Sequence, residues 1–422
     1  MIVIRRRRAD VVAGVAGPLL LTLVTTCAGH LPPCPAAGGP TWTELESAHF
    51  RLRTDEDAAA GRAALTDLEQ LQAALLMAVF GVPPDLDTGK LPVVVVDRGW
   101  TDFAPRQVDG YFTYALFQPL IVMVAGSQLH RQDLIKHELV HYLSHMVMPH
   151  QPRWLAEGLA TYYETIEYEA DSARLTVGRP SPGRLRDAQH LSVSSIESIF
   201  TAPTVDSEDA RFYGAAWITL HFLMNHRAVA LESYEKALRD GASPEVAWTT
   251  AFGAETPAQL AFEVRQYLDG GQYEILVYKF PPPRLTAPIE RRLTDADTHS
   301  TRALLYLTGA RTRSLSPELA LGSDDPRPAA KRELDEALRQ DPAHVRSRAI
   351  FHWMLGGPVD LGQATAASRT SADDWLAWLL LVDARGANHD AAGRSEALAR
   401  AINIARSDRS IAILGRERRT GH

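Results

Sequence analysis

The sequence contains very little cysteine. Its 422 residues include two, Cys27 and Cys34, and both precede the first segment with a strand or helix pattern. Two cysteines in such a place cannot build a disulfide scaffold or a thiolate zinc site. Any metal ion bound by this chain therefore needs histidine and carboxylate ligands.

Excess positive charge is also absent. The chain has 44 Lys and Arg residues against 51 Asp and Glu residues, which leaves a formal charge of -7. Without a basic field to attract phosphates, a nucleic-acid partner is not expected. Apolar residues at 45% and charged residues at 23% exclude collagen, coiled coil and disorder, and the length suits two or three domains.

The apolar segment near the N-terminus is too short to cross a membrane. Residues 11–24 number fourteen and follow four arginines, whereas a transmembrane helix needs about 20 apolar residues. This pattern is typical of an export signal, which we place at residues 1–29. The sequence VTTC ending at Cys27 resembles a lipoprotein processing site, although Thr26 replaces the usual small residue; lipidation and ordinary cleavage near Ala28 both stay open. Either way, we expect an exported protein that is periplasmic, in the cell envelope or secreted, with a lipid anchor as its possible membrane attachment.

Beyond a Pro- and Gly-rich tether at residues 30–40, the patterns predict an α+β fold. Strand patterns and one helical pattern come first, and helical patterns then dominate. The expected strands are residues 47–54, 91–97, 110–114 and 120–125, with a helix at 57–80; the later helices are 128–147, 153–167, 209–225, 228–239 and 257–268, and a last strand falls within 272–280. The sequence thus predicts a small N-terminal sheet with a helix, followed by a helical region.

A proline-rich linker at residues 281–290 precedes a third region, 291–422, which is helical by pattern. In KRELDEALRQDP, the residues Ala330, Leu334 and Ala337 have the spacing of the second helix of a tetratricopeptide repeat. Neighbouring repeats are degenerate, so we expect a repeat-like helical region that packs on the domain before it. An ordinary amphipathic helix pair is the alternative.

The sequence LIKHELVHYL carries the pattern H-E-x-x-H in His137, Glu138 and His141. Helical residues four apart lie on one face, so the two imidazoles can reach one zinc ion at about 2.0 to 2.1 Å. Glu138 lies about 100° away around the helix. It can therefore accept a proton from the hydrolytic water without being a ligand.

A third ligand must come from a second helix, and Glu157 in PRWLAEGLATYYE follows sixteen residues after His141. Two histidines and one glutamate leave the fourth position for water or substrate, which is the catalytic arrangement. His145 is a rival donor, but it stands about 12 Å along the helix from His137.

With HELVH followed by WLAEGLA, the sequence resembles the gluzincin metallopeptidases, and more narrowly the bacterial peptidase-MA-like proteins. The resemblance implies a zincin-type helical catalytic domain at residues 41–280, Zn²⁺ as cofactor, His137, His141 and Glu157 as ligands, and Glu138 as general base. The exopeptidase branch has a Gly-x-Met-x-Asn motif before the zinc helix. Here PLIVMVAGS has neither an acidic residue nor Asn, so aminopeptidase activity is disfavoured.

Weaker candidates surround these ligands. Tyr213 lies in the position where related enzymes often place a tyrosine that stabilises the oxyanion, and a packed core tyrosine is the competing interpretation. Thr161 and Glu164 could orient a ligand imidazole, with solvent-facing polarity as their alternative. His221 and His226 are expected to be packing or surface residues.

The sequence therefore predicts an exported zinc metallopeptidase that cuts internal bonds of a peptide or protein substrate. A strand at residues 120–125 could bind the substrate as an added strand. The alternative is a catalytically weak or inactive zincin scaffold whose C-terminal helices bind a partner protein or peptide.

Overall fold

The computed structural model of the protein describes residues 39–81, 89–97, 99–104, 110–126, 133–169, 171–201, 210–280, 283–315 and 325–407. The predicted signal peptide, both cysteines and nearly all of the tether lie outside these residues. Within them, no helix combines the length and the apolar character needed to cross a membrane.

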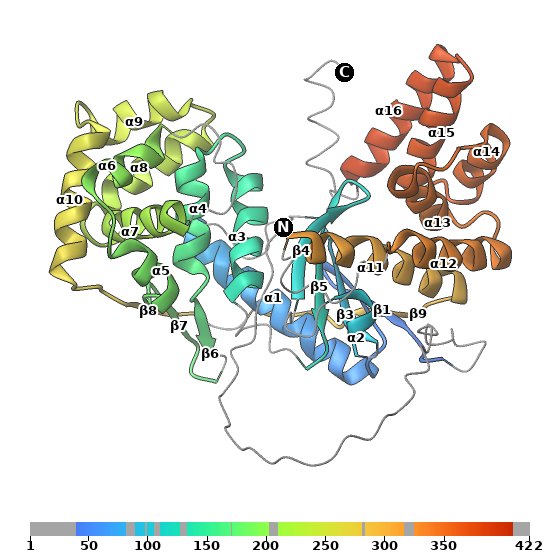
Figure 1. The fold of residues 1–422 in the computed structure, drawn as a ribbon, viewed down its shortest axis with the longest axis horizontal. Coiled ribbons are helices and arrows are strands. Elements are labelled where there is room, and N and C mark those ends of the chain that lie inside the picture. The colour runs from blue at the N-terminus through green and yellow to red at the C-terminus, as the bar shows by residue number, and fades with distance from the viewer. Residues whose placement is uncertain are drawn as a thin grey trace, which may run out of the picture. The chain divides into compact units, whose positions relative to one another are not determined.

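The chain forms two compact units, and each is built from segments that are distant in sequence. The sheet unit comprises Met1–Arg62, Gly89–Ser127 and Pro288–His422; the helical unit comprises Ala63–Thr88 and Gln128–Ala287. Both the sheet and the abundant helices confirm the predicted α+β class (Figure 1).

A six-stranded mixed sheet is the centre of the sheet unit. Its strands are β1 (Thr43–Glu46), β2 (Phe50–Thr54), β3 (Leu91–Val96), β4 (Gly110–Ala115), β5 (Gln118–Val124) and β9 (Ile289–Arg292). They lie in the order β4-β5-β3-β2-β1-β9; β3 is parallel to β2 and β5, and the other pairs are antiparallel. The helix α1 (Ala58–Phe80) provides the crossover between the parallel strands β2 and β3, as the βαβ rule requires.

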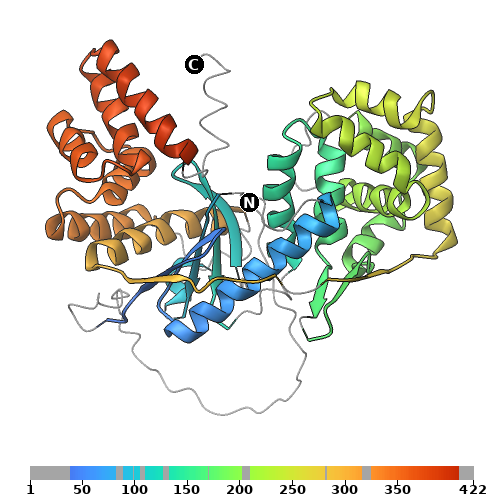
Figure 2. The same cartoon turned by 180° about the vertical axis from the view of Figure 1, so that it is seen from behind.

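The C-terminal helices share a hydrophobic core with this sheet. They are α11 (Asp295–Leu315), α12 (Arg327–Gln340), α13 (Val345–Ala349) with a π-helical turn (Ile350–Met354), α14 (Leu361–Thr370), α15 (Trp375–Ala387) and α16 (Ala391–Ser407); the short α2 (Trp100–Phe103) also belongs to this unit. Figure 2 shows α11 beside α12 and α15 beside α16, as their contacts require. One cluster of buried residues joins Trp42 and Val122 of the sheet part to Leu304, Leu334 and Trp375 of these helices.

This division differs from the linear domain boundaries expected from the sequence. The expected linker at residues 281–290 ends inside β9, which pairs with β1 in an antiparallel register from Thr43↔Arg292 to Glu46↔Ile289. All four β9 side chains are exposed, so the strand leaves no alternating hydrophobic pattern to detect. Through β9, the chain returns to its own N-terminal sheet.

The helical unit carries the segments with the strongest motifs. Its helices are α3 (Asp133–Val147), α4 (Arg153–Tyr163), α5 (Pro182–Ala188), α6 (Val193–Glu197), α7 (Ala210–His226), α8 (Ala228–Arg239), α9 (Pro244–Phe252) and α10 (Pro257–Gly270), with a 3-10 turn at Ser198–Phe200. A small antiparallel sheet has the order β6 (Glu167–Glu169), β7 (Arg174–Val177) and β8 (Leu276–Lys279). The predicted strand within residues 272–280 is present as β8, whereas β6 and β7 were not predicted.

The expectation about the strand at residues 120–125 is wrong. That strand exists as β5, but it lies inside the sheet, paired with β3 on one side and β4 on the other. Its backbone groups are already hydrogen-bonded, so it cannot accept a substrate as an added strand.

Candidate metal centre

The HELVH segment lies on α3, where burial fixes the direction of both histidines. Ile135, Leu139 and Leu143, spaced four apart, are fully buried and anchor one stripe of the helix in the core. His137 and His141 form a second stripe with the same spacing. His137 is 1% exposed, so its ring is held rigidly.

The second motif lies on α4, which packs closely against α7. A Cβ atom on Gly158 would lie 3.1 Å from the carbonyl oxygen of Ala216 and 3.2 Å from Cβ of Leu220. Only a glycine lets the two helices approach this far without a shift of backbone. The glycine of WLAEGLA therefore sets the depth at which the preceding Glu157 enters the site.

Three side chains from these two helices converge on one point. Nε2 of His137 lies 3.1 Å from Nε2 of His141, and Oε2 of Glu157 lies 3.6 and 3.2 Å from these two nitrogens. Ligands at the usual 2.0 to 2.2 Å from a tetrahedral metal ion stand about 3.4 Å apart. The three atoms thus have the separations of a metal ligand set, and the group could hold a metal ion.

The hydrogen-bonding state of Glu157 supports this interpretation. Its Oε2 atom is buried but makes no hydrogen bond of acceptable geometry, although two imidazole nitrogens are near. A buried carboxylate oxygen without a partner is costly. A cation placed among the three ligand atoms would satisfy it.

Glu164 orients the first histidine from the opposite side of its ring. Nδ1 of His137 donates a hydrogen bond to Oε2 of Glu164 at 3.2 Å. With its proton held on Nδ1, the ring directs the lone pair of Nε2 toward the point where the three ligand atoms converge. Glu164 therefore acts on the imidazole and is not itself one of the three ligands.

Arg184 in α5 holds Glu164 in turn. Its guanidinium donates from Nε to Oε1 at 3.0 Å and from Nη2 to Oε2 at 2.9 Å. This bidentate contact fixes the orientation of the Glu164 carboxylate. Gly214 lets α5 approach α7, because a Cβ atom there would lie 2.9 Å from the backbone nitrogen of Ala188. No motif or periodic pattern points to Arg184, which follows Glu164 by twenty residues and lies on a helix that we did not predict.

The electrostatics of the group favour a bound cation. Burial by itself lowers the pKa of His137, but the nearby carboxylates of Glu157, Glu164 and Glu138 outweigh burial and raise the pKa to about 9. Burial raises the pKa of Glu157, yet the two histidines lower it well below its usual range. Three carboxylates near two imidazoles thus stabilise positive charge at this point.

Glu138 and Tyr213 also lie in this region. Glu138 is 7% exposed, and in the described part of the chain its carboxylate has no hydrogen bond and no ion pair. The ring of Tyr213, on α7, has its centre 6.4 Å from that of His137. Burial and the charge of Glu157 raise the pKa of Tyr213, so its hydroxyl stays protonated.

The remaining candidates have other contacts. The hydroxyl of Thr161 donates to the carbonyl oxygen of Glu157 at 2.6 Å within α4, so it does not touch an imidazole in this way. His221 is fully buried, with Nε2 donating to the carbonyl of Gly178 at 3.0 Å, as suits a packing residue. His145 is not part of the ligand group found among the described residues.

The sequence was compared with protein-family models and with curated proteins. No family model matches it, and no curated protein is significantly similar to it. The interpretation of the metal centre therefore rests on the residues and the geometry of this chain.

Proposed function

We propose that the protein is an exported zinc metallopeptidase of the gluzincin type that hydrolyses internal peptide bonds. The observation that carries the proposal is the convergence of Nε2 of His137, Nε2 of His141 and Oε2 of Glu157, at 3.1 to 3.6 Å from one another. Three protein ligands with no fourth are the arrangement of catalytic zinc sites, because the open position admits water and substrate.

The donor set supports zinc among the possible ions. Two imidazole nitrogens and one carboxylate oxygen suit Zn²⁺, whereas Ca²⁺ and Mg²⁺ prefer sites made of oxygen ligands alone. The hydrogen bond from His137 to Glu164 is the outer contact that zinc-binding histidines usually make. When bound, the ion would supply Lewis acidity toward the attacking water and the substrate carbonyl.

The residues of the chain have distinct parts in the proposed reaction. The carboxylate of Glu138, which is free of other partners among the described residues, accepts the proton of the attacking water and delivers it to the leaving amine. The protonated hydroxyl of Tyr213 donates a hydrogen bond to the carbonyl oxygen as negative charge develops there. Glu164 and Arg184 hold His137 in position throughout.

Cleavage inside the substrate chain is supported by the missing exopeptidase motif. PLIVMVAGS contains no acidic residue and no Asn to bind a free amino terminus. Peptides with both ends blocked should therefore be cut as well as unblocked ones. Export rests on the N-terminal segment, whose arginines and fourteen-residue apolar stretch are typical of a signal peptide.

The substitution Glu138→Gln tests the proposal. An amide cannot accept the proton of water, but the three ligands stay intact, so zinc content should match the parent while the rate falls about 100- to 10,000-fold. The assay measures zinc per chain and cleavage of a mixture of end-blocked fluorogenic peptides. Glu167→Gln, a change at an exposed residue of β6, is the matched control and should keep full activity.

Activity of Glu138→Gln within a few-fold of the parent would reject the assignment of the base. A parent protein that binds zinc but cleaves no peptide in the mixture would instead favour the inactive scaffold.

A further inference from the structure

Four side chains of the helical unit form a closed loop of contacts beside the metal centre. His137 donates from Nδ1 to Oε2 of Glu164 at 3.2 Å, and Arg184 donates from Nη2 to the same oxygen at 2.9 Å. The guanidinium carbon of Arg184 lies 5.2 Å from the ring centre of Tyr213, which in turn lies 6.4 Å from the ring centre of His137. The four residues belong to α3, the C-cap of α4, α5 and α7. Arg184 thus contacts both Tyr213 and the carboxylate that orients the first metal ligand.

Arg184 makes these two contacts with different surfaces of one planar group. The edge of its guanidinium faces both oxygens of Glu164 through Nε and Nη2, while its carbon lies over the ring of Tyr213. A guanidinium can donate along its edge and stack on an aromatic ring through its face, whereas a lysine ammonium is a compact point charge. The side chain of Arg184 is 24% exposed and that of Glu164 is 7% exposed, so neighbouring residues restrict both.

The backbone that carries Arg184 lies directly against the helix that carries Tyr213. Gly214 follows Tyr213 on α7. A Cβ atom on Gly214 would lie 2.9 Å from the backbone nitrogen of Ala188 and from the carbonyl carbon of Asp187, both on α5. Only a glycine permits this approach without a shift of backbone. The separation of α5 and α7 is therefore fixed next to Tyr213 and one turn from Arg184.

In the proposed reaction, His137 helps to hold the ion and Tyr213 donates to the oxyanion, so the distance between these two residues affects how well the developing charge is stabilised. A misplacement of about 1 Å can cost about 100-fold in rate. We propose that Arg184 is a positioning residue that couples the two: it holds the ring of Tyr213 by its face and, through Glu164, the imidazole that binds the ion. The effect on rate rests on the proposed function, whereas the contacts can be tested without turnover.

The first experiment measures thermal unfolding of the full, zinc-free protein. Arg184→Lys keeps the positive charge but loses the planar face and the bidentate contact, so it should lower the midpoint in the parent. In a Tyr213→Leu background, where the ring is gone, the same change should lower the midpoint by about 1 to 4 °C less. In a Tyr213→Phe background, which keeps a ring, the shift should match that in the parent. Equal shifts in all three backgrounds would overturn the coupling.

The second experiment measures zinc affinity. Arg184→Lys weakens the hold on Glu164, so the affinity should fall about tenfold, at the lower end of the loss expected when an outer partner of a ligand is removed. Tyr213→Phe removes a hydroxyl outside the ligand group and should leave the affinity unchanged. An Arg184→Lys protein that binds zinc as tightly as the parent would refute the link to the metal ligand.

The third experiment measures cleavage of end-blocked peptides at saturating zinc. Arg184→Lys should lower kcat about tenfold or more with little change in KM, because it alters position and not substrate binding. In a Tyr213→Phe background the same change should cost less, since the hydroxyl is already lost. Equal fold losses in both backgrounds would overturn the role in catalysis. A parent without activity would reject the proposed function, and the first two experiments would then still decide whether Arg184 couples the two residues.

Two further variants complete the design. Arg186→Lys, at an exposed position of the same helix α5, is the matched control and should behave as the parent in all three experiments. If Arg184→Lys does not fold, Glu164→Gln combined with Arg184→Met replaces it, because this pair removes the buried carboxylate together with its cation. The pair also lacks the guanidinium, so its midpoint shift should depend on the ring of Tyr213 in the same way, and a shift independent of that ring would overturn the proposal.

Discussion

Removal of Glu157 is the most direct test of the metal centre. In Glu157→Ala the ligand oxygen, 3.2 and 3.6 Å from the two imidazole nitrogens, is lost, and two nitrogens 3.1 Å apart remain. Loss of an outer partner of a ligand typically costs 10- to 100-fold in metal affinity. Loss of one of three ligands should cost more, so we expect affinity to fall by more than about 100-fold while the fold persists.

The assay is zinc per chain after dialysis against a mild chelator, followed by competition with a chromophoric chelator. Glu164→Ala should lose about 10- to 100-fold, because it removes only the acceptor of the His137 Nδ1 proton. Glu167→Ala, at an exposed position of β6, should change nothing, and so should His145→Ala. Circular dichroism checks that each variant is folded.

Full zinc retention in Glu157→Ala would refute the ligand set. If His145→Ala released the metal instead, the ion would be held by the first motif helix alone, and the second motif would have no catalytic meaning.

Three further predictions concern other parts of the molecule. Tyr213→Phe should lower kcat about 100- to 1,000-fold with little change in KM if its hydroxyl stabilises the oxyanion; a change within a few-fold would make it a packing residue. Burial raises the pKa of Glu235 from 4.5 to about 7, so the folded state favours the protonated carboxyl group. The stability that this protonated group contributes is fully present below pH 4.5 and is lost as the pH rises through 7. Glu235→Gln should therefore raise the free energy of unfolding by about 3 kcal/mol at pH 8 relative to pH 4, measured by urea denaturation, and equal effects at both pH values would contradict the buried-carboxyl argument. With its native leader the protein should appear outside the cytoplasm without its first residues, and incorporation of a fatty-acid analogue that is lost in Cys27→Ala would show lipidation, whereas an unlabelled parent would show ordinary cleavage.

The sequence by itself determined the local parts of the candidate site. His137 and His141 share a helix face because the α-helical repeat places residues four apart in line, and α3 has the expected helical form. Periodicity likewise located α1, α8, β3 and the hairpin of β4 and β5, since each pattern is contained in one short stretch of chain. Glu157 could be proposed as the third metal ligand because it lies within the motif WLAEGLA.

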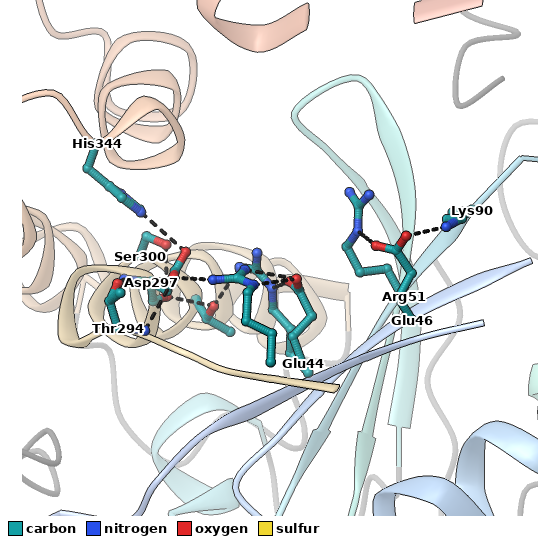
Figure 3. Close-up of polar contacts among 11 residues, drawn as sticks. Glu44, Glu46, Arg51, Lys90, Thr294, Asp297, Ser300 and His344 are labelled. Atoms are coloured by element: carbon teal, nitrogen blue, oxygen red, sulfur yellow. Dashed lines mark hydrogen bonds and ion pairs between the residues drawn. The ribbon is translucent and has the colours of Figure 1, made fainter. Parts of the chain in front are cut away.

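The tertiary structure alone decided what distant segments do together. The pairing of Arg184 with Glu164, and of Glu164 with His137, joins three helices that no periodic pattern connects. The return of β9 to β1 combines backbone pairing with an ion pair between Arg291 and Glu44, two residues that are far apart in the sequence (Figure 3). Local periodicity reports which face of an element is buried, whereas charge pairing and strand pairing depend on the path of the whole chain.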